Sequence, residues 1–129
     1  MENTVKVNRY SEIREKLLAA FSDLRRQGII ARADYMCCGS CATYNLLLEA
    51  ERRSDKGKVV KGIAYWHKQD EESFRKSGML FIGYSGVKKF RCKLIAEMIV
   101  ETLNEYGLVT EWDGSDSNKV EVKGIHETK

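Results

Sequence analysis

Proline is absent from all 129 residues of this sequence. A cis-proline turn is therefore excluded, and helices must end at glycines or at polar capping residues. The N-terminal segment lacks the apolar stretch of a secretion signal, and no part of the chain approaches the roughly 18 consecutive apolar residues that a membrane span requires. We therefore expect a cytoplasmic protein that does not cross a membrane.

A dominant charge of either sign is also missing, because 22 lysines and arginines are interspersed with 19 acidic residues for a formal net charge of +3. This pattern argues against a broad cationic face for duplex DNA, so a nucleic acid partner is not supported. With 43% hydrophobic residues, the chain can form one core. We predict a single domain over residues 1–129, with an ordered part of about residues 9–125.

Three segments have apolar residues at helical spacing, over residues 10–27, 42–53 and 87–106. Gly28 and Gly107 should end the first and the third of these helices. Glycine readily adopts the left-handed conformation that follows a helix, and an apolar residue comes directly after each of the two glycines.

Residues 59–67 and 78–84 are rich in β-branched and aromatic residues and are predicted to be strands, joined by the polar linker 68–77. Both strands are apolar on both faces, so they should lie in the middle of the sheet with each face covered. Residues 108–112 and 119–123 should form a hairpin, with the final strand at a protected edge of the sheet.

These elements predict an α+β fold in the order α-α-β-β-α-β-β, in which three helices pack on a four-stranded, mostly antiparallel sheet. Residues 29–36 are expected to form only an apolar connection between the first helix and a group of cysteines. If the helices leave part of the sheet uncovered, a homodimer would cover the remainder.

Three of the four cysteines, Cys37, Cys38 and Cys41, lie within five positions. Cys38 and Cys41 have the C-x-x-C spacing at the predicted start of a helix, where free N–H groups and the helix dipole favour the thiolate form. Thiolate is the form that binds a metal ion or acts as a nucleophile. A reducing cytoplasm disfavours a structural disulfide here, and burial of the cysteines as compact packing residues is the structural alternative.

Zinc is the metal that suits this segment, because it takes sulfur and nitrogen ligands in a tetrahedron. Cys37, Cys38 and Cys41 would supply three sulfurs, and His67 would supply the nitrogen. The sequence has no second C-x-x-C and no H-x₃-H motif that would complete a familiar zinc site. The remaining cysteine, Cys92, is expected to be a small packing residue in the third helix.

The main alternative is a thiol-dependent enzyme or redox sensor, so whether the chain is an enzyme stays open. Cys38 or Cys37 would attack, Cys41 would resolve the product, and His67 would act as a base that Asp70 orients. A thioredoxin-type enzyme is excluded, because the motif follows a helix and the chain has no proline for the opposing cis turn. Asp70 has a competing explanation as the cap of a short helix within residues 68–77.

A third reading is a protein-interaction module without a metal. An exposed patch that includes Trp66, Tyr84 or Trp112 would indicate such a module. Its partner would be another protein or a second copy of this chain.

Four motifs, in their order along the chain, resemble those of a family of small bacterial proteins known only as a domain of unknown function. They are a segment ending in Cys-Cys-x-x-Cys (residues 30–41), a segment ending in His-x-Gln-Asp (residues 62–70), an apolar strand ending in Gly-Tyr, and Gly-Leu-x-x-x-Trp-Asp-Gly (residues 107–114). The resemblance implies that the cysteine and histidine segments meet in space, and it implies no activity. The sequence thus predicts a binding or regulatory domain with a cysteine-rich site suited to zinc.

Overall fold

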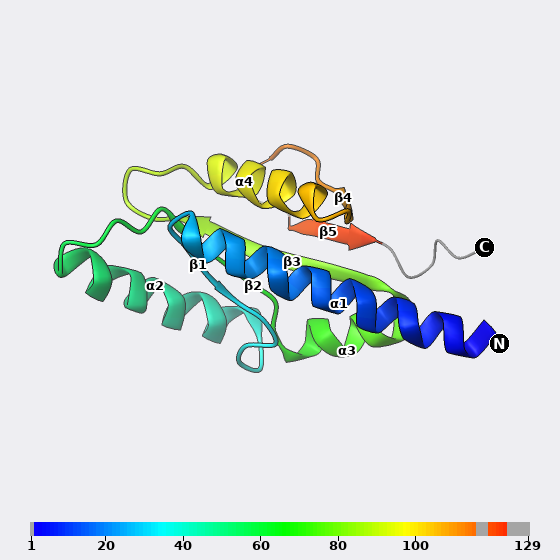
Figure 1. Cartoon of the computed structure of the whole chain (residues 1–129). Helices are drawn as coiled ribbons and strands as arrows, with labels where there is room; N and C mark the ends of the chain where they lie inside the picture. Colours follow the sequence, from blue (N-terminus) through cyan, green and yellow to red (C-terminus); the bar gives the residue numbers. More distant parts are fainter. Residues whose placement is uncertain (1, 116–118, 124–129) are drawn as a thin grey trace.

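The computed structural model describes residues 2–115 and 119–123. Its elements, in chain order, are α1 (Glu2–Arg26), β1 (Ile29–Arg32), α2 (Gly39–Asp55), β2 (Gly62–Tyr65), α3 (Lys68–Ser77), β3 (Met79–Gly86), α4 (Cys92–Glu105), β4 (Val109–Glu111) and β5 (Val120–Lys123) (Figure 1). The fold is α+β, as predicted, but its described part has four helices and five strands rather than three and four. None of the helices described is long and apolar enough to cross a membrane.

The five strands form one mixed sheet in the order β1-β2-β3-β5-β4. β1 runs parallel to β2, and the other three pairings are antiparallel. The expectation that residues 29–36 form only a connection was wrong, since β1 occupies their first half. A four-residue strand with three buried residues shows no alternation, so its local sequence does not distinguish it from a buried connection.

The predicted hairpin is confirmed, because β4 and β5 pair antiparallel and Val120 and Val122 are buried. Its predicted place in the sheet was wrong. β5 lies between β3 and β4, and the three-residue β4 forms the edge. A short edge strand limits pairing with other chains, so the protection comes from β4.

Both glycine stops are confirmed, since Gly28 and Gly107 have φ angles of +99° and +82°. At Gly107 the N–H of Leu108 donates to the carbonyl of Leu103 at 3.1 Å, which is the hydrogen bond of a Schellman motif. The helix that ends there begins at Cys92 rather than at residue 87.

Residues 87–91 form a turn before α4, which corrects the predicted helix over 87–106. The N–H of Phe90 donates to the carbonyl of Val87 at 3.1 Å, and Lys88 has a φ of +57°. A left-handed residue interrupts helical geometry, so the helical periodicity of the sequence extends further than the helix itself.

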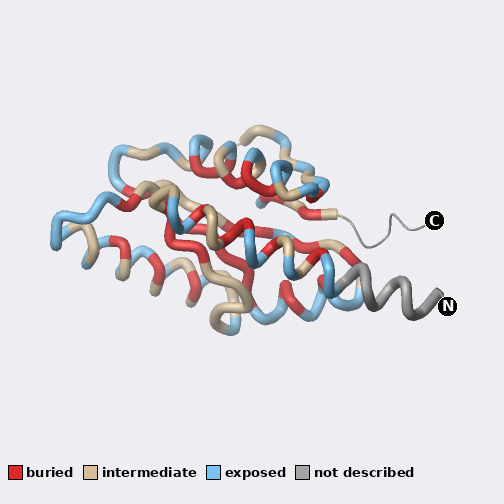
Figure 2. Tube along the Cα trace, in the orientation of Figure 1, coloured by how far each residue is buried: buried red, intermediate tan, exposed pale blue. Residues whose placement is uncertain are grey.

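The helices form layers on the two faces of the sheet (Figure 1). α1 and α4 cover one face, where together with Phe74 of α3 they enclose the larger core around Trp66, Leu80 and Ile82. α2 covers the other face, where its small and apolar residues pack on Ile30 and Ile63. Figure 2 shows the corresponding buried stretches along the strands and along the helix sides that face them.

The face that α2 covers is open over β3 and β4. Phe81 is 37% exposed and Val109 is 52% exposed, and the strand registers place both on this face. The prediction of cover on both faces therefore holds for β2, whose four residues are all buried, and fails for β3. α2 packs on β2 and reaches only the near part of β3, which explains the difference.

Candidate functional site

The cysteine turn, residues 33–38, connects β1 to α2 and is fixed against the end of β2. The N–H of Tyr35 donates to the carbonyl of Trp66 at 2.9 Å, and the N–H of Lys68 donates to the carbonyl of Met36 at 3.1 Å. Asp34 and Met36 have φ angles of +50° and +64°, which turn the chain sharply before the first cysteine. These two hydrogen bonds flank position 67, so the turn and His67 are held together by backbone.

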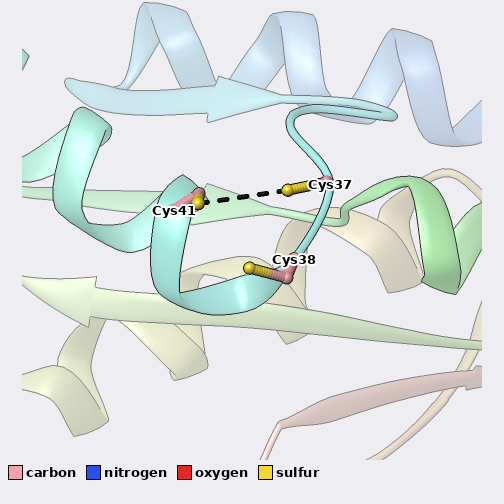
Figure 3. Close-up of side chains that lie close together, drawn as sticks. All are labelled: Cys37, Cys38 and Cys41. Carbon is pink, nitrogen blue, oxygen red and sulfur yellow. Dashed lines mark hydrogen bonds between the residues drawn. The ribbon is translucent and has the colours of Figure 1, made fainter.

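Three thiols lie close together where the turn enters α2 (Figure 3). The sulfurs of Cys37, Cys38 and Cys41 are within 4.8 Å of one another, and those of Cys37 and Cys41 are 4.0 Å apart. Thiolates around a tetrahedral zinc ion would be roughly 3.8 Å apart, given Zn–S bonds of about 2.3 Å. All three thiols are free, with Cys37 exposed and the other two half-buried. Small side-chain rotations would therefore bring the sulfurs to metal-binding distances.

Cys38 and Cys41 occupy the N-cap and the first turn of α2, as the sequence predicts. The backbone N–H of Cys41 lowers the pKa of Cys38, and the Cys41 thiol adds to this effect, although Cys38 makes no regular capping hydrogen bond. The Cys38 and Cys37 thiols in turn raise the pKa of Cys41 to about 11. The first proton thus leaves most readily from Cys38, and the resulting thiolate opposes loss of the next one.

His67 is the N-cap of α3 and forms a capping box with Asp70. The N–H of Asp70 donates to His67 Nδ1 at 3.3 Å, and the N–H of His67 donates to Asp70 Oδ2 at 3.3 Å. His67 Nε2 lies 3.2 Å from the same carboxylate oxygen. The competing explanation of Asp70 as the helix cap was nearly right, but the roles are exchanged, because the imidazole nitrogen accepts the cap hydrogen bond.

The His67 side chain is nearly buried, and burial lowers its pKa against the opposing attraction of Asp70. The neutral ring fits these contacts when Nε2 carries the proton, because Nδ1 then accepts from the backbone and Nε2–H faces the carboxylate. Lys119 approaches the same carboxylate at 3.9 Å and lowers the His67 pKa further. Both ring nitrogens are therefore engaged by Asp70 in this structure.

Gly39 of the C-x-x-C segment lies against His67. A Cβ at position 39 would lie 3.9 Å from His67 Nε2 and 3.5 Å from the Tyr65 hydroxyl oxygen. The imidazole thus lies directly against the C-x-x-C backbone, but within the described residues the set of donor atoms that share the 4.8 Å spacing consists of the three sulfurs. The fold brings the cysteine turn and His67 together as neighbours, and the role of His67 as a ligand stays a prediction.

Sequence reasoning missed the polar contacts that anchor α2. The hydroxyls of Thr43 and Tyr65 lie 2.9 Å apart, and a Cβ at position 83 would be 2.5 Å from the Tyr65 ring, so Gly83 makes room for that ring. Thr43 comes two residues after Cys41, and the contact holds the start of α2 on β2. The strand is apolar on both faces, so its sequence did not reveal this contact, and Tyr65 looked like one more aromatic core residue.

The aromatic residues that would mark an interaction patch are engaged inside the fold. Trp66 is fully buried, and its indole N–H donates to Glu71 at 2.8 Å. Trp112 and Tyr84 are half-buried, with the Trp112 N–H donating to the Tyr84 hydroxyl at 3.1 Å. None of the three forms the exposed patch considered above.

Cys92 lies apart from the three clustered thiols, at the first residue of α4. It is half-buried, and its sulfur accepts a hydrogen bond from the N–H of Gly86 at 3.4 Å. Cys92 therefore has a polar role in addition to the expected packing role, because its thiol accepts a hydrogen bond from a backbone N–H at the end of β3.

The fold and the site define an α+β domain that carries a three-thiol turn. The chain belongs to the family described as a domain of unknown function (DUF6891), whose model matches residues 10–128. The resemblance found in the sequence is thereby confirmed as to the family. No curated protein and no solved structure matches the chain.

Proposed function

We propose that this chain is a cytoplasmic regulatory or interaction domain that binds zinc through Cys37, Cys38 and Cys41. The observation that carries the proposal is the spacing of three free sulfurs within 4.8 Å of one another at a helix N-terminus. Three thiols packed this closely resist ionising together, as the raised pKa of Cys41 shows. A divalent cation removes that repulsion and stabilises the ionised form.

The donor set selects the class of metal. Sulfur ligands favour zinc and other thiophilic ions over magnesium or calcium, which require oxygen. His67 is the candidate for the fourth ligand, because a Cβ on Gly39, within the C-x-x-C segment, would lie 3.9 Å from its Nε2. To bind zinc as a neutral ring, Nε2 would leave Asp70 and the ring proton would move to Nδ1, which would then give up the hydrogen bond that it accepts from the Asp70 N–H.

The test is metal analysis of protein purified under reducing conditions. We expect about one zinc per chain in the unmodified protein and none above background in Cys38→Ser/Cys41→Ser. Cys92→Ser is the matched control, because it removes a half-buried thiol outside the cluster and should keep the zinc. Absence of zinc from the unmodified protein, or its loss from the control, would contradict the proposal.

A cobalt-substituted sample distinguishes the ligand sets. Replacing zinc with cobalt gives a thiolate-to-metal charge-transfer band whose intensity reports the number of sulfurs. His67→Gln should leave that band in place and change the ligand-field bands if the imidazole is the fourth ligand. Unchanged spectra would show that the fourth position is filled by water or by another group, and the zinc proposal would then rest on the three sulfurs alone.

Reversible thiol oxidation is the second candidate function, and the lowered pKa of Cys38 favours it. A peroxide would convert the Cys38 thiolate to a sulfenic acid with release of hydroxide, and the Cys41 thiol would then displace water to form a disulfide. Both nitrogens of His67 are engaged by Asp70, so this chemistry draws on the helix N-terminus rather than on a histidine base.

The alkylation rate of Cys38 as a function of pH tests this second function. In a Cys37→Ser/Cys92→Ser variant, we expect an inflection below that of a model cysteine, near pH 8.5. A rate that follows the model thiol would remove the reason to propose redox sensing.

A further inference from the structure

One end of the molecule carries basic side chains that form no ion pairs with the described residues. We call it the cationic end and define it by eight basic residues, none of which makes an ion pair with another residue that the structure describes: Arg52, Lys56, Lys58, Lys61, Lys88, Lys89, Arg91 and Lys93. All are exposed except Lys61, which is half-buried.

The fold gathers these residues from two separate stretches of sequence. The N–H of Val87 donates to the carbonyl of Lys61 at 3.0 Å, and Gly62 pairs with Gly86 in the sheet. The loop after α2 and the loop before α4 therefore run side by side. Figure 1 shows that α1 and α2 end, and α4 begins, at this one end of the molecule. The cysteine turn lies at the opposite end of α2.

A depression of about 280 Å³ lies on the α2 side of the cationic end. It is lined by Arg52, Arg53, Lys56, Lys58 and Glu49. The only carboxylate among these residues already pairs with Arg53 and, at 3.0 Å, with Arg32. The depression thus presents a strong excess of positive charge to any anion that enters it.

The loop before α4 is rigid, and its charged side chains are exposed to solvent. A Cβ at position 86 would lie 2.0 Å from the carbonyl oxygen of Phe90, so the loop closes tightly on Gly86. Lys89 lies 5.7 Å from the centre of the Phe90 ring, and Lys88 holds a left-handed conformation. A preformed loop loses little conformational entropy when a ligand binds.

The acidic residues near this surface do not balance it. Glu51, Asp55 and Glu97 are exposed on α2 and α4, and Glu49 is held by two arginines as described above. The formal charge of the whole chain is only +3, so the residues outside these eight carry a net negative charge. A polyanion is therefore directed to this end and repelled elsewhere.

We propose that the cationic end binds the phosphate backbone of a nucleic acid. A single phosphate would use only the depression, whereas a chain of phosphates would reach from the depression to the loop before α4. Nucleic acid offers evenly repeated charges and gains free energy from released counterions. The side chains at this surface are lysines and arginines on two loops and on the adjoining ends of α2 and α4, where they would contact phosphates, so the binding should be independent of base sequence.

Fluorescence anisotropy with labelled single-stranded and duplex DNA of about 20 nucleotides tests the proposal, over salt concentrations from about 50 to 200 mM. We expect both probes to bind, with affinity falling steeply as salt rises. Lys56→Gln/Lys58→Gln and Lys88→Gln/Lys89→Gln should each weaken binding about tenfold or more at low salt. Each should also reduce the slope of log K against log salt by roughly 1.4 to 1.8, for two lost phosphate contacts.

Lys16→Gln/Lys76→Gln is the control, because these lysines lie on α1 and α3 away from the cationic end, where they pair with Glu12 and Glu72. It should bind like the unmodified protein. Weakening by the control equal to that of the test variants, or no binding by the unmodified protein at low salt, would overturn the proposal. Equally tight binding of polyglutamate would also overturn it, since the surface would then recognise any polyanion.

DNA binding at the cationic end does not require the metal site. Cys38→Ser/Cys41→Ser should bind DNA as the unmodified protein does, because the cysteines lie at the other end of α2. Zinc binding and DNA binding can therefore fail separately in these experiments.

Discussion

Cys41 is the thiol of the cluster that most resists ionisation, because its neighbours raise its pKa to about 11. At neutral pH it carries a proton that zinc must displace. We therefore expect zinc affinity to rise as the pH increases from about 6 to 8, by up to tenfold per pH unit for each proton released. Calorimetric titration in two buffers with different ionisation enthalpies measures the number of protons released.

The same titration with Cys92→Ser serves as the control and should release the same number of protons. A zinc affinity that does not change with pH would show that thiol deprotonation is not part of binding. In that case the cluster would not be the site.

His67 should make the stability of the fold depend on pH. Its pKa is lowered by burial, so the unfolded chain binds a proton more readily than the folded one. The stability it contributes is therefore present above the unfolded pKa of about 6.5 and is lost as the pH falls below it, by at most about 1.4 kcal/mol per pH unit. Urea unfolding at about pH 7.5 and 5.5 measures the free energy of unfolding.

His67→Asn keeps a good N-cap residue and should reduce the loss of stability between these two pH values. The other histidine, His126, lies outside the described residues, and His126→Asn is the control that should match the unmodified protein. An unchanged pH dependence in His67→Asn would assign it to other groups.

At the scale of single residues, the sequence identified the three clustered thiols and their place at a helix start. It could not identify His67 as the cap of α3, because histidine is an unusual N-cap and Asp70 has the residue type expected there. The hydrogen bond between Thr43 and Tyr65 was equally hidden, since it joins residues from two elements whose relative position depends on the whole fold.

Among the elements, α1, α3 and the end of β2 are joined by one buried carboxylate. Glu71 accepts from the Trp66 indole N–H at 2.8 Å and from Arg14 Nε at 2.9 Å. Glu71→Gln keeps the size of the side chain but replaces one acceptor with a donor that faces these donors. We expect the free energy of unfolding to fall by about 1 to 3 kcal/mol, measured by urea denaturation.

Glu72→Gln is the matched control, because Glu72 neighbours Glu71 on α3 and its ion pair with Lys76 is exposed. That change should cost less than about 0.5 kcal/mol. If the two variants lose the same stability, the carboxylate of Glu71 does not join these elements in the way described.

The observed boundaries of helices and strands differ from the predicted ones where contacts between distant segments, and not the local sequence, determine the structure. β1 exists because its parallel partner β2 supplies hydrogen bonds that no local pattern signals. The segment 68–77 becomes helix α3 because Phe74 is buried in the larger core, although its neighbours are polar. The long periodic helices and the hairpin were predictable, since a strong apolar repeat or a turn-rich linker specifies each of them locally.

For the whole molecule, the order of strands decides which charges and which apolar faces lie together. Basic residues that look interspersed along the chain form the cationic end because Lys61 and Val87 are joined across β2 and β3. Along the chain the charges look evenly mixed, because this pairing between distant segments is not visible in the sequence. The same strand order leaves half of one sheet face open, which periodicity alone did not show.

The open half of the sheet predicts a contrast between two neighbouring residues of β3. Phe81 is 37% exposed on the open face, while Ile82 is fully buried under α1 and α4. Phe81→Thr should therefore cost about 1 kcal/mol or less, because threonine suits a strand and little packing is lost. Ile82→Ala should cost about 2 to 5 kcal/mol through the cavity it creates. Urea denaturation at several protein concentrations measures both changes. An equal cost for the two, together with stability that rises with concentration, would mean that a second copy of the chain covers this face.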